Sequence, residues 1–321
     1  MVDMKWKKLG KIFNPLNHQL PNRCIEFAQS PQTLIFDNFV RIYFSTREKD
    51  QTGKYLSHIS FIDIDKKFKN IINVSSDTVI KLGELGCFDE HGIFPINIFK
   101  ENDKIHAYTT GWNRKVSVSA DASIGYATSH DNGLTFDKLG TGPILTSNLN
   151  EPFLVGDAFV TKFKNLYHMW YIYGNKWISD PSEKEPQRIY KIVHATSKNG
   201  INWEREGKHI ITDVIGENEC QALPTVIYHK QKYHMYFCFR DAIGFRFDES
   251  KGYKIGYAYS YDLINWKRDD ENAGITKGPE GSWDSNMICY PHLFKCDNKI
   301  YLLYNGNEFG RFGFGIAVLE D

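Results

Sequence analysis

Acidic side chains recur in this chain immediately upstream of short apolar segments that repeat along its length. Carboxylates gathered at one site repel each other, so one acquires a raised pKa and can donate a proton, while another stays ionised as base or nucleophile. Cleavage of a glycosidic bond requires that division of roles. Alternatively, single members of the set only cap strand ends or bind loop amides. The acidic candidates are Asp89, Glu90, Asp157, Glu217, Glu219 and Asp284.

A second set of polar and aromatic side chains follows the next apolar segment of each repeat. Trp112 and Trp177 could stack on the apolar face of a sugar ring, or they could only shield a rim from solvent. Arg47 and Arg240 could clamp a carboxylate or phosphate, or they could pair with neighbouring acids. With His91 and two of the acids added, the candidate substrate-binding residues are Arg47, His91, Trp112, Lys176, Trp177, Glu217, Arg240, Asp284 and Asn307.

A strand-like phrase recurs about every 65 residues and indicates one sheet repeated around an axis. Its copies lie at 124–129, 192–197 and 255–260, and each is followed by a turn and an aromatic residue. Another strand-like segment occurs in five copies, each preceded by polar residues typical of hairpins. Five copies predict an all-β, five-bladed β-propeller with four-stranded antiparallel blades.

The two ends of the chain carry complementary parts of one blade. Residues 314–318 match a third strand, and residues 5–12 resemble the fourth-strand segment at 202–209. An N-terminal strand at 4–13 would therefore complete blade five and close the ring, which removes exposed sheet edges. We expect one propeller domain over 1–321, the alternative being two β-sandwiches. Its blades are predicted at 22–75, 88–145, 152–212, 217–272 and 283–320.

A propeller would bring the candidate residues together. The first strand of each blade lines the axis, and the loop after the second strand returns to the same mouth. Side chains just before strand one and just after strand two are therefore expected to converge there. This convergence is what would turn acids scattered along the sequence into a single site.

Composition excludes several classes of partner and cofactor. The formal net charge is zero, so no basic field favours nucleic acid or an anionic membrane. No apolar run is long enough to span a bilayer, and the first residues lack the apolar core of a secretion signal. Six cysteines without a CxxC pair predict reduced thiols in a cytoplasmic protein. No zinc, Walker or dinucleotide motif is present, so we expect no metal and no cofactor.

The five blades, the closing N-terminal strand and the axial acids resemble the five-bladed β-propeller glycosidase superfamily, which includes arabinanases, β-xylosidases, fructosidases, invertases and mannoside phosphorylases. The resemblance implies that Glu219 is the general acid and that Asp157 holds its protonation state. Blade one has Gln29-Ser30-Pro31 where the arabinanase and xylosidase branch has a base Asp. Asp89 or Glu90 on blade two is therefore the expected base or nucleophile.

The sequence leaves three functions open. The first is a carbohydrate-active enzyme that cleaves or transfers a glycosidic bond of an oligosaccharide, with an anionic substrate allowed by the two arginines. The second is a phosphorylase in which phosphate, held by Arg47, Arg240 and His91 or Lys176, replaces the attacking water. The third is a non-catalytic propeller that binds a sugar or sugar phosphate in polysaccharide biosynthesis.

Overall fold

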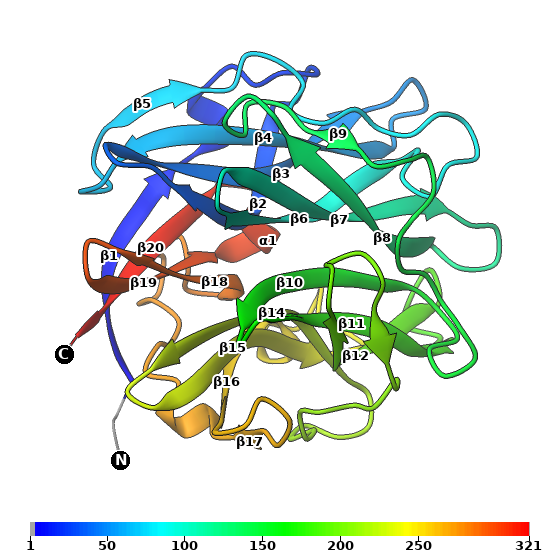
Figure 1. Ribbon diagram of the computed structural model, residues 1–321. Helices are drawn as coiled ribbons and strands as arrows, with labels where there is room; N and C mark the ends of the chain where they lie inside the picture. Colours follow the sequence, from blue (N-terminus) through cyan, green and yellow to red (C-terminus); the bar gives the residue numbers. More distant parts are fainter. Residues whose placement is uncertain (1–3, 321) are drawn as a thin grey trace.

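The computed structural model describes residues 4–320, which form an all-β protein arranged around a central axis (Figure 1). Twenty strands, three 3-10 turns and the short helix α1 (Asn307–Gly310) make up the regular structure in this range. The strands form five antiparallel groups of four, two of which are joined by a single parallel bridge between Ser57 and Gly92. Each group's inner strand contacts that of the next, and the fifth contacts the first. The fold is therefore the predicted five-bladed propeller.

Within each blade the four strands follow one another from the axis outwards. Blade one contains, in this order, β2 (Glu26–Ile35), β3 (Phe39–Lys49), β4 (Tyr55–Asp65) and β5 (Ile71–Val74). Blade two contains β6 (Gly92–Glu101), β7 (Lys104–Arg114), β8 (Ala120–Ser129) and β9 (Asp137–Lys138). Blade three contains β10 (Val155–Phe163), β11 (Leu166–Ile178), β12 (Gln187–Ser197) and β13 (Glu204–Arg205). Blade four contains β14 (Glu219–His229), β15 (Lys232–Asp241), β16 (Lys254–Ser260) and β17 (Lys267–Arg268). Blade five contains β18 (Cys289–Cys296), β19 (Lys299–Asn305), β20 (Phe314–Glu320) and β1 (Lys5–Phe13).

The N-terminal strand closes the ring, as expected from the similarity of the two ends. β1 pairs antiparallel with β20, with Trp6 opposite Leu319 and Lys8 opposite Ala317. In Figure 1 the blue first strand lies beside the red last strands. The edge of β20 is therefore covered, and no blade lacks its fourth strand within residues 4–320.

Three of the hairpins between first and second strands have two consecutive residues with positive φ. These pairs are Lys164 and Asn165, Lys230 and Gln231, and Asp297 and Asn298. Positive φ at both central residues is the geometry of a type I′ turn, whose twist matches that of the flanking strands. The polar turn residues found in the sequence therefore set the register of strands one and two.

Each inner strand contains a β-bulge at the same height in the ring. The ladder between strands one and two shifts register near Ser30, Phe94, Asp157, Leu223 and Tyr290. Four of these residues have positive φ, and the fifth, Phe94, precedes a cis proline. A bulge bends its strand and turns a side chain out of the regular alternation. Residues at or next to the bulges can therefore face the axis.

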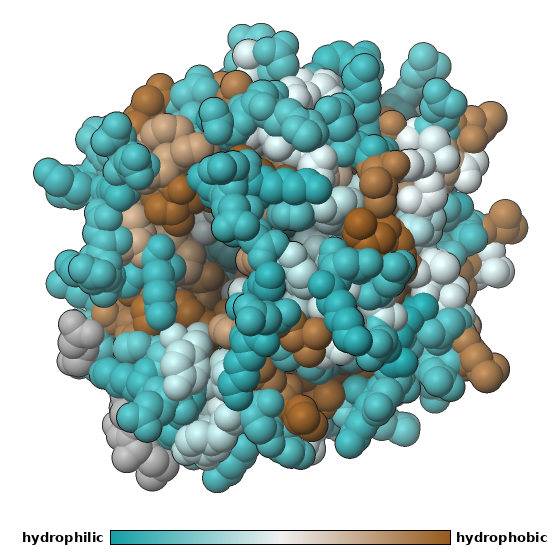
Figure 2. Space-filling model, in the orientation of Figure 1, coloured by the Kyte–Doolittle hydropathy of each residue, from teal (hydrophilic) through white to brown (hydrophobic). Residues whose placement is uncertain are grey.

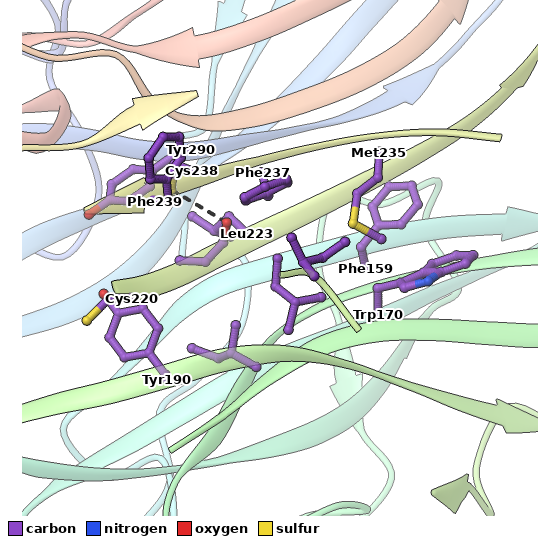
Figure 3. Close-up of a cluster of buried hydrophobic side chains, with 14 of the residues drawn as sticks. Phe159, Trp170, Tyr190, Cys220, Leu223, Met235, Phe237, Cys238, Phe239 and Tyr290 are labelled. Atoms are coloured by element: carbon purple, nitrogen blue, oxygen red, sulfur yellow. Dashed lines mark hydrogen bonds between the residues drawn. The ribbon is translucent and has the colours of Figure 1, made fainter. Parts of the chain in front are cut away.

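The largest hydrophobic core cluster lies where blades three, four and five meet. Figure 3 shows Trp170, Tyr190, Phe237 and Tyr290 among its side chains. Cys238 in the same cluster donates its thiol hydrogen to the backbone carbonyl of Ala222. The inner strands of these blades are thus fixed by aromatic packing on the side away from solvent.

The outer surface differs from this core. Figure 2 shows a face that is mainly hydrophilic, with hydrophobic side chains scattered singly or in small groups.

All six cysteines are free thiols. None of the helices in the described part of the chain is long and apolar enough to cross a membrane.

Candidate active site

A pocket of about 660 Å³ opens at the axis and is lined by residues from all five blades. Bulge residues form part of its wall, among them Phe94, Asp157 and Tyr290. Tyr190, Tyr253 and Tyr290 belong both to the pocket wall and to the largest core cluster. Figure 3 labels Tyr190 and Tyr290. The pocket is therefore built on the rigid part of the propeller.

Asp157 is the one buried acid among the residues that line the pocket. It sits in the bulge of β10 with φ +53°, and its backbone N–H donates to Oγ1 of Thr110 over 2.7 Å. Burial raises the pKa of Asp157 to about 7, although the Leu223 amide and the charge of Arg188 act in the opposite direction. A carboxyl that is half protonated near neutral pH can donate or accept a proton.

Four arginines also line the pocket: Arg47, Arg188, Arg240 and Arg246. Among the ion pairs recorded for residues 4–320, none joins these guanidinium groups to a carboxylate. A guanidinium that is not neutralised by the protein favours an anionic ligand. The pocket thus combines one titratable acid with several unneutralised cations.

Arg47 and Arg188 are half-buried and keep donors free for a ligand. Arg47 donates through Nε to Oε1 of Gln29 over 3.0 Å and lies over the ring of Phe27. Arg188 donates through Nη1 to the hydroxyl of Ser119 over 3.2 Å. Burial lowers the pKa of Arg47, and the charge of Arg188 contributes in the same direction. Two such groups could hold one phosphate.

Arg240 is more deeply buried, with 4% of its surface exposed. It donates to the hydroxyl of Tyr190 over 2.8 Å and to the carbonyl of Asp241 over 2.7 Å, while its Nε has no partner. Its guanidinium carbon lies 3.5 Å from the ring centroid of Phe245. A charge buried without a carboxylate is costly. The alternative that Arg240 pairs with the carboxylate of Asp241 is wrong, since only the backbone oxygen of Asp241 is used.

The expectation that acids from nearly every blade converge at the pocket is wrong. Asp89, Glu219 and Asp284 do not line it, and each is buried beside a cation of the outermost strand of its own blade. A fourth acid, Glu151, follows the same rule. We call these ion pairs the blade clasps; they are Asp89–Lys138, Glu151–Arg205, Glu219–Arg268 and Asp284–Lys8.

The surroundings of Glu219 do not suit a general acid. Its carboxylate accepts from Arg268 over 2.5 Å, from Gln221 over 2.8 Å and from the amide of Val214 over 2.9 Å. Burial would raise the pKa of Glu219, but the Val214 amide and Arg268 outweigh it and hold the pKa below its ordinary value. A general acid needs the opposite shift, so we assign Glu219 a structural role in its blade clasp.

The predicted base or nucleophile on blade two is also engaged elsewhere. Asp89 is fully buried and ion-paired with Lys138. Glu90 accepts from the amide of Gly86 over 2.6 Å and lies 3.2 Å from Nδ1 of His91. His91 in turn stacks on Trp112. Asp89, Glu90 and His91 therefore do not line the pocket, whereas Trp112 does.

The remaining predicted substrate-binding residues lie outside the pocket. Lys176 and Glu217 are exposed, and Trp177 packs against the core cluster. Asp284 is held by Lys8 and by the hydroxyl of Tyr304. Asn307 accepts from the amides of residues 286 and 287. Of the predicted site residues, the structure brings together Arg47, Trp112, Asp157 and Arg240.

The sequence prediction missed pocket residues that come from third strands and from the loops before them. Arg188 and Tyr190 lie at the start of β12, and Phe245 and Tyr253 precede β16. Strand three starts at the end of the blade where strand two finishes, so the same geometric rule could have found them. The described residues hold no group of three or more His, Cys, Asp or Glu placed to bind a metal ion.

Two proteins of Mycobacterium tuberculosis match the whole chain. The uncharacterized proteins MT1551 and Rv1502 are each 31% identical over 319 residues, which is 99% of this chain and 100% of theirs. A 1,2-beta-oligomannan phosphorylase of Thermoanaerobacter sp. (strain X514) is 30% identical over 206 residues, covering 62% of this chain and 58% of that protein. No protein-family model matches the chain.

Solved structures of propeller glycosidases share the fold. A glycoside hydrolase superposes with a TM-score of 0.73 at 15% identity, covering 98% of this chain and 93% of the other. A structure described with the GH130 family of mannoside phosphorylases and hydrolases superposes with a TM-score of 0.68 at 12% identity, covering 99% and 94%. The predicted resemblance to the propeller glycosidases is thus confirmed at the level of the fold.

Proposed function

This chain belongs to the family of the M. tuberculosis proteins Rv1502 and MT1551, and we propose that it is a glycoside phosphorylase, an enzyme that cleaves a glycosidic bond of an oligosaccharide by transfer to phosphate. The observation that carries the proposal is the pocket's combination of one buried acid with a pKa near 7 and arginines that have no carboxylate partner. The similarity to an oligomannan phosphorylase supports the same reaction.

The proton chemistry falls to Asp157. In its protonated form it donates a proton to the glycosidic oxygen, the bond from that oxygen to the anomeric carbon breaks, and a phosphate oxygen forms the new bond to that carbon. The leaving sugar carries the proton away as a hydroxyl, and Asp157 is left ionised until it takes up a proton from water. Its pKa near 7 keeps both forms populated at neutral pH.

Phosphate binding falls to Arg47 and Arg188, which line the same pocket as Asp157 and keep Nη donors without a recorded partner. Two guanidinium groups offset the charge of the phosphate and orient one oxygen towards the sugar. Trp112 offers an aromatic face for a sugar ring. The chain's own residues thus account for the proton, the nucleophile's position and sugar stacking.

Phosphate fits this pocket better than an activated water. Hydrolysis needs a second carboxylate about 5–10 Å from the acid, to serve as base or nucleophile. The other acids at the pocket are unsuited to this role: Asp121 is paired with Lys115, Glu183 accepts from the amide of Gly244, and Glu185 is exposed. Phosphate is itself anionic and needs no base.

A second candidate function is a propeller that binds a sugar phosphate without cleaving it. The ion pairs that occupy Asp89, Glu219 and Asp284 favour this alternative, because they remove three of the acids expected to do chemistry. Binding without turnover would require Asp157 to serve only as a hydrogen-bonding group. Turnover measurements separate the two functions.

Replacement of the acid tests the proposal. Incubated with phosphate and 1,2-linked β-oligomannan, the wild type should release a sugar 1-phosphate, and Asp157→Asn should lower kcat by about 10²–10⁴-fold. Asp103→Asn, in the exposed hairpin between β6 and β7, is the matched control and should keep wild-type kcat. If Asp157→Asn turns over as fast as Asp103→Asn, Asp157 is not the general acid.

A further inference from the structure

One side of the pocket presents hydrogen-bond donors and positive charge that the proposed phosphate site does not use. Arg240, Tyr190 and Tyr253 all line the pocket on the side of blades three and four. Arg240 donates to the Tyr190 hydroxyl over 2.8 Å, and the Tyr190 and Tyr253 hydroxyls lie 2.6 Å apart. We call these three residues the Arg240 relay.

The protons of this relay can be counted. Both tyrosine hydroxyls keep their protons at neutral pH, because burial raises the pKa of each well above its ordinary value. One of the two hydroxyl protons is donated in the hydrogen bond between Tyr190 and Tyr253. Among the residues described, no acceptor is recorded for the second hydroxyl proton. The relay therefore has a spare O–H donor at the pocket wall, polarised by the guanidinium of Arg240.

The charge of the relay is also uncompensated. Arg240 is buried and its Nε lacks a partner. It donates to the Tyr190 hydroxyl and the Asp241 carbonyl, and its other recorded contacts are with the aromatic faces of Tyr190, Phe245 and Tyr253, none of which carries a negative charge. Two acids of the pocket wall, Glu183 and Glu185, have no recorded ion pair with it within residues 4–320. A buried cation with a spare donor beside it is stabilised by an anionic oxygen.

The Arg240 relay and Arg47 lie on different blades. Arg47 is on β3 of blade one, whereas Arg240 is on β15 of blade four, and these blades are not neighbours in the ring. Arg188 lies on β12 of blade three, two residues before Tyr190 of the relay. An anion held at Arg47 is therefore separate from an anion held at Arg240. We propose, on the basis of the proposed function, that the sugar substrate itself carries an anionic group, either a carboxylate or a phosphate ester. This group binds at the Arg240 relay, while inorganic phosphate binds at Arg47 and Arg188.

Calorimetric titration of the full chain tests this with three sugars that share one hexose ring and differ at C6: D-mannose, D-mannuronate and D-mannose 6-phosphate. At least one charged sugar should bind tenfold or more tightly than mannose. The charged sugar that gains affinity identifies the group as carboxylate or phosphate ester. If neither charged sugar binds more tightly than mannose, or neither binds at all, the proposal is overturned.

Variants locate the anion. Tyr253→Phe, which removes one of the two relay hydroxyls but keeps the ring, should weaken the charged sugar about tenfold or more and leave mannose unchanged. Arg240→Gln should also weaken binding of the charged sugar and leave binding of mannose unchanged. If the Arg240→Gln protein does not fold, Tyr253→Phe still tests the proposal. Tyr261→Phe, on an exposed tyrosine, is the matched control. Equal weakening of charged and neutral sugars by Tyr253→Phe would overturn the proposal.

Inorganic phosphate provides the last arm. The affinity for inorganic phosphate should fall in Arg47→Gln and stay unchanged in Tyr253→Phe. If the affinity instead falls in Tyr253→Phe and stays unchanged in Arg47→Gln, phosphate binds at the Arg240 relay and the second anion site is refuted. These experiments measure binding, so their results do not depend on whether the protein catalyses phosphorolysis. A protein that prefers charged sugars but forms no sugar 1-phosphate would refute phosphorolysis and leave the relay intact.

Discussion

At the scale of single residues, the environment of each carboxyl decides its chemistry. Asp157 is buried without a directly bonded cation, so burial raises its pKa to about 7. Glu219 is also buried but is bonded to Arg268 and to backbone amides, so its pKa is lowered. The sequence shows both as acids near the start of an inner strand. Their partners, far away in sequence, make one a candidate acid and the other a structural anion.

The raised pKa of Asp157 predicts a pH-dependent cost to stability. The folded protein binds this proton more tightly than the unfolded chain, so stability falls as pH rises from about 4 through about 7 and the cost is complete above that range. Asp157→Asn, which cannot ionise, should therefore raise Tm at pH 8 relative to wild type, and the difference should shrink at pH 5. Thermal melts at the two pH values measure it; a gain that is the same at both would contradict the raised pKa.

At the scale of the elements, the blade clasps explain why acids recur at the blade starts. Each clasp ties the first residue of an inner strand, or the segment just before it, to the outermost strand of the same blade, so it holds all four strands against splaying. The cation follows an aromatic residue by two positions in the sequence, as in Trp6 and Lys8 or Trp203 and Arg205. That repeated spacing was visible in the sequence and is the signal that would have identified the acids as structural.

Breaking a clasp should reduce stability without removing catalysis. Glu219→Gln leaves Arg268 facing a neutral side chain in a buried setting, and loss of one partner of a buried pair costs about 3–5 kcal/mol. Glu217→Gln, two residues earlier and exposed, should change little. Denaturant unfolding gives the stabilities. A Glu219→Gln protein that is as stable as wild type but loses turnover by a hundredfold or more would return Glu219 to the role of general acid.

At the scale of the whole molecule, radial symmetry and side-chain hydrogen bonds between blades hold the pocket together. The Val160 amide of blade three donates to Asn97 of blade two, and the Leu293 amide of blade five donates to Thr225 of blade four. The Thr33 amide of blade one donates to His292 of blade five. These bonds link inner strands near the axis, so the pocket wall depends on a closed ring.

Ring closure should therefore be sensitive to the N-terminal strand. Trp6 is buried in β1 and donates through Nε1 to the hydroxyl of Tyr236 in blade four over 2.9 Å. Trp6→Ala should cost about 3–5 kcal/mol, since it removes a large buried ring. Lys7→Ala, on the exposed side of the same strand, should be nearly neutral. Equal unfolding midpoints for the two variants would show that β1 contributes little to closure.

The sequence was sufficient for the fold but only in part for the site. Repeats, hairpin residues and matching ends are local patterns, and they predicted the blades and the closing strand. Which acids face the axis depends on bulges such as that at Asp157 and on ion pairs such as Glu219–Arg268, which join residues 49 positions apart. Arg188 was missed because it lies in a third strand, whereas convergence was predicted only for the first two strands of each blade. Long-range pairing therefore limited the prediction of the site.

The most direct test of phosphorolysis is ³¹P NMR of the wild type with 1,2-linked β-oligomannan and inorganic phosphate. The pocket chemistry predicts a new sugar 1-phosphate resonance that grows as the phosphate resonance declines, and that is lost in Asp157→Asn. Release of reducing sugar at the same rate without phosphate, with no new phosphorus resonance in its presence, would contradict it.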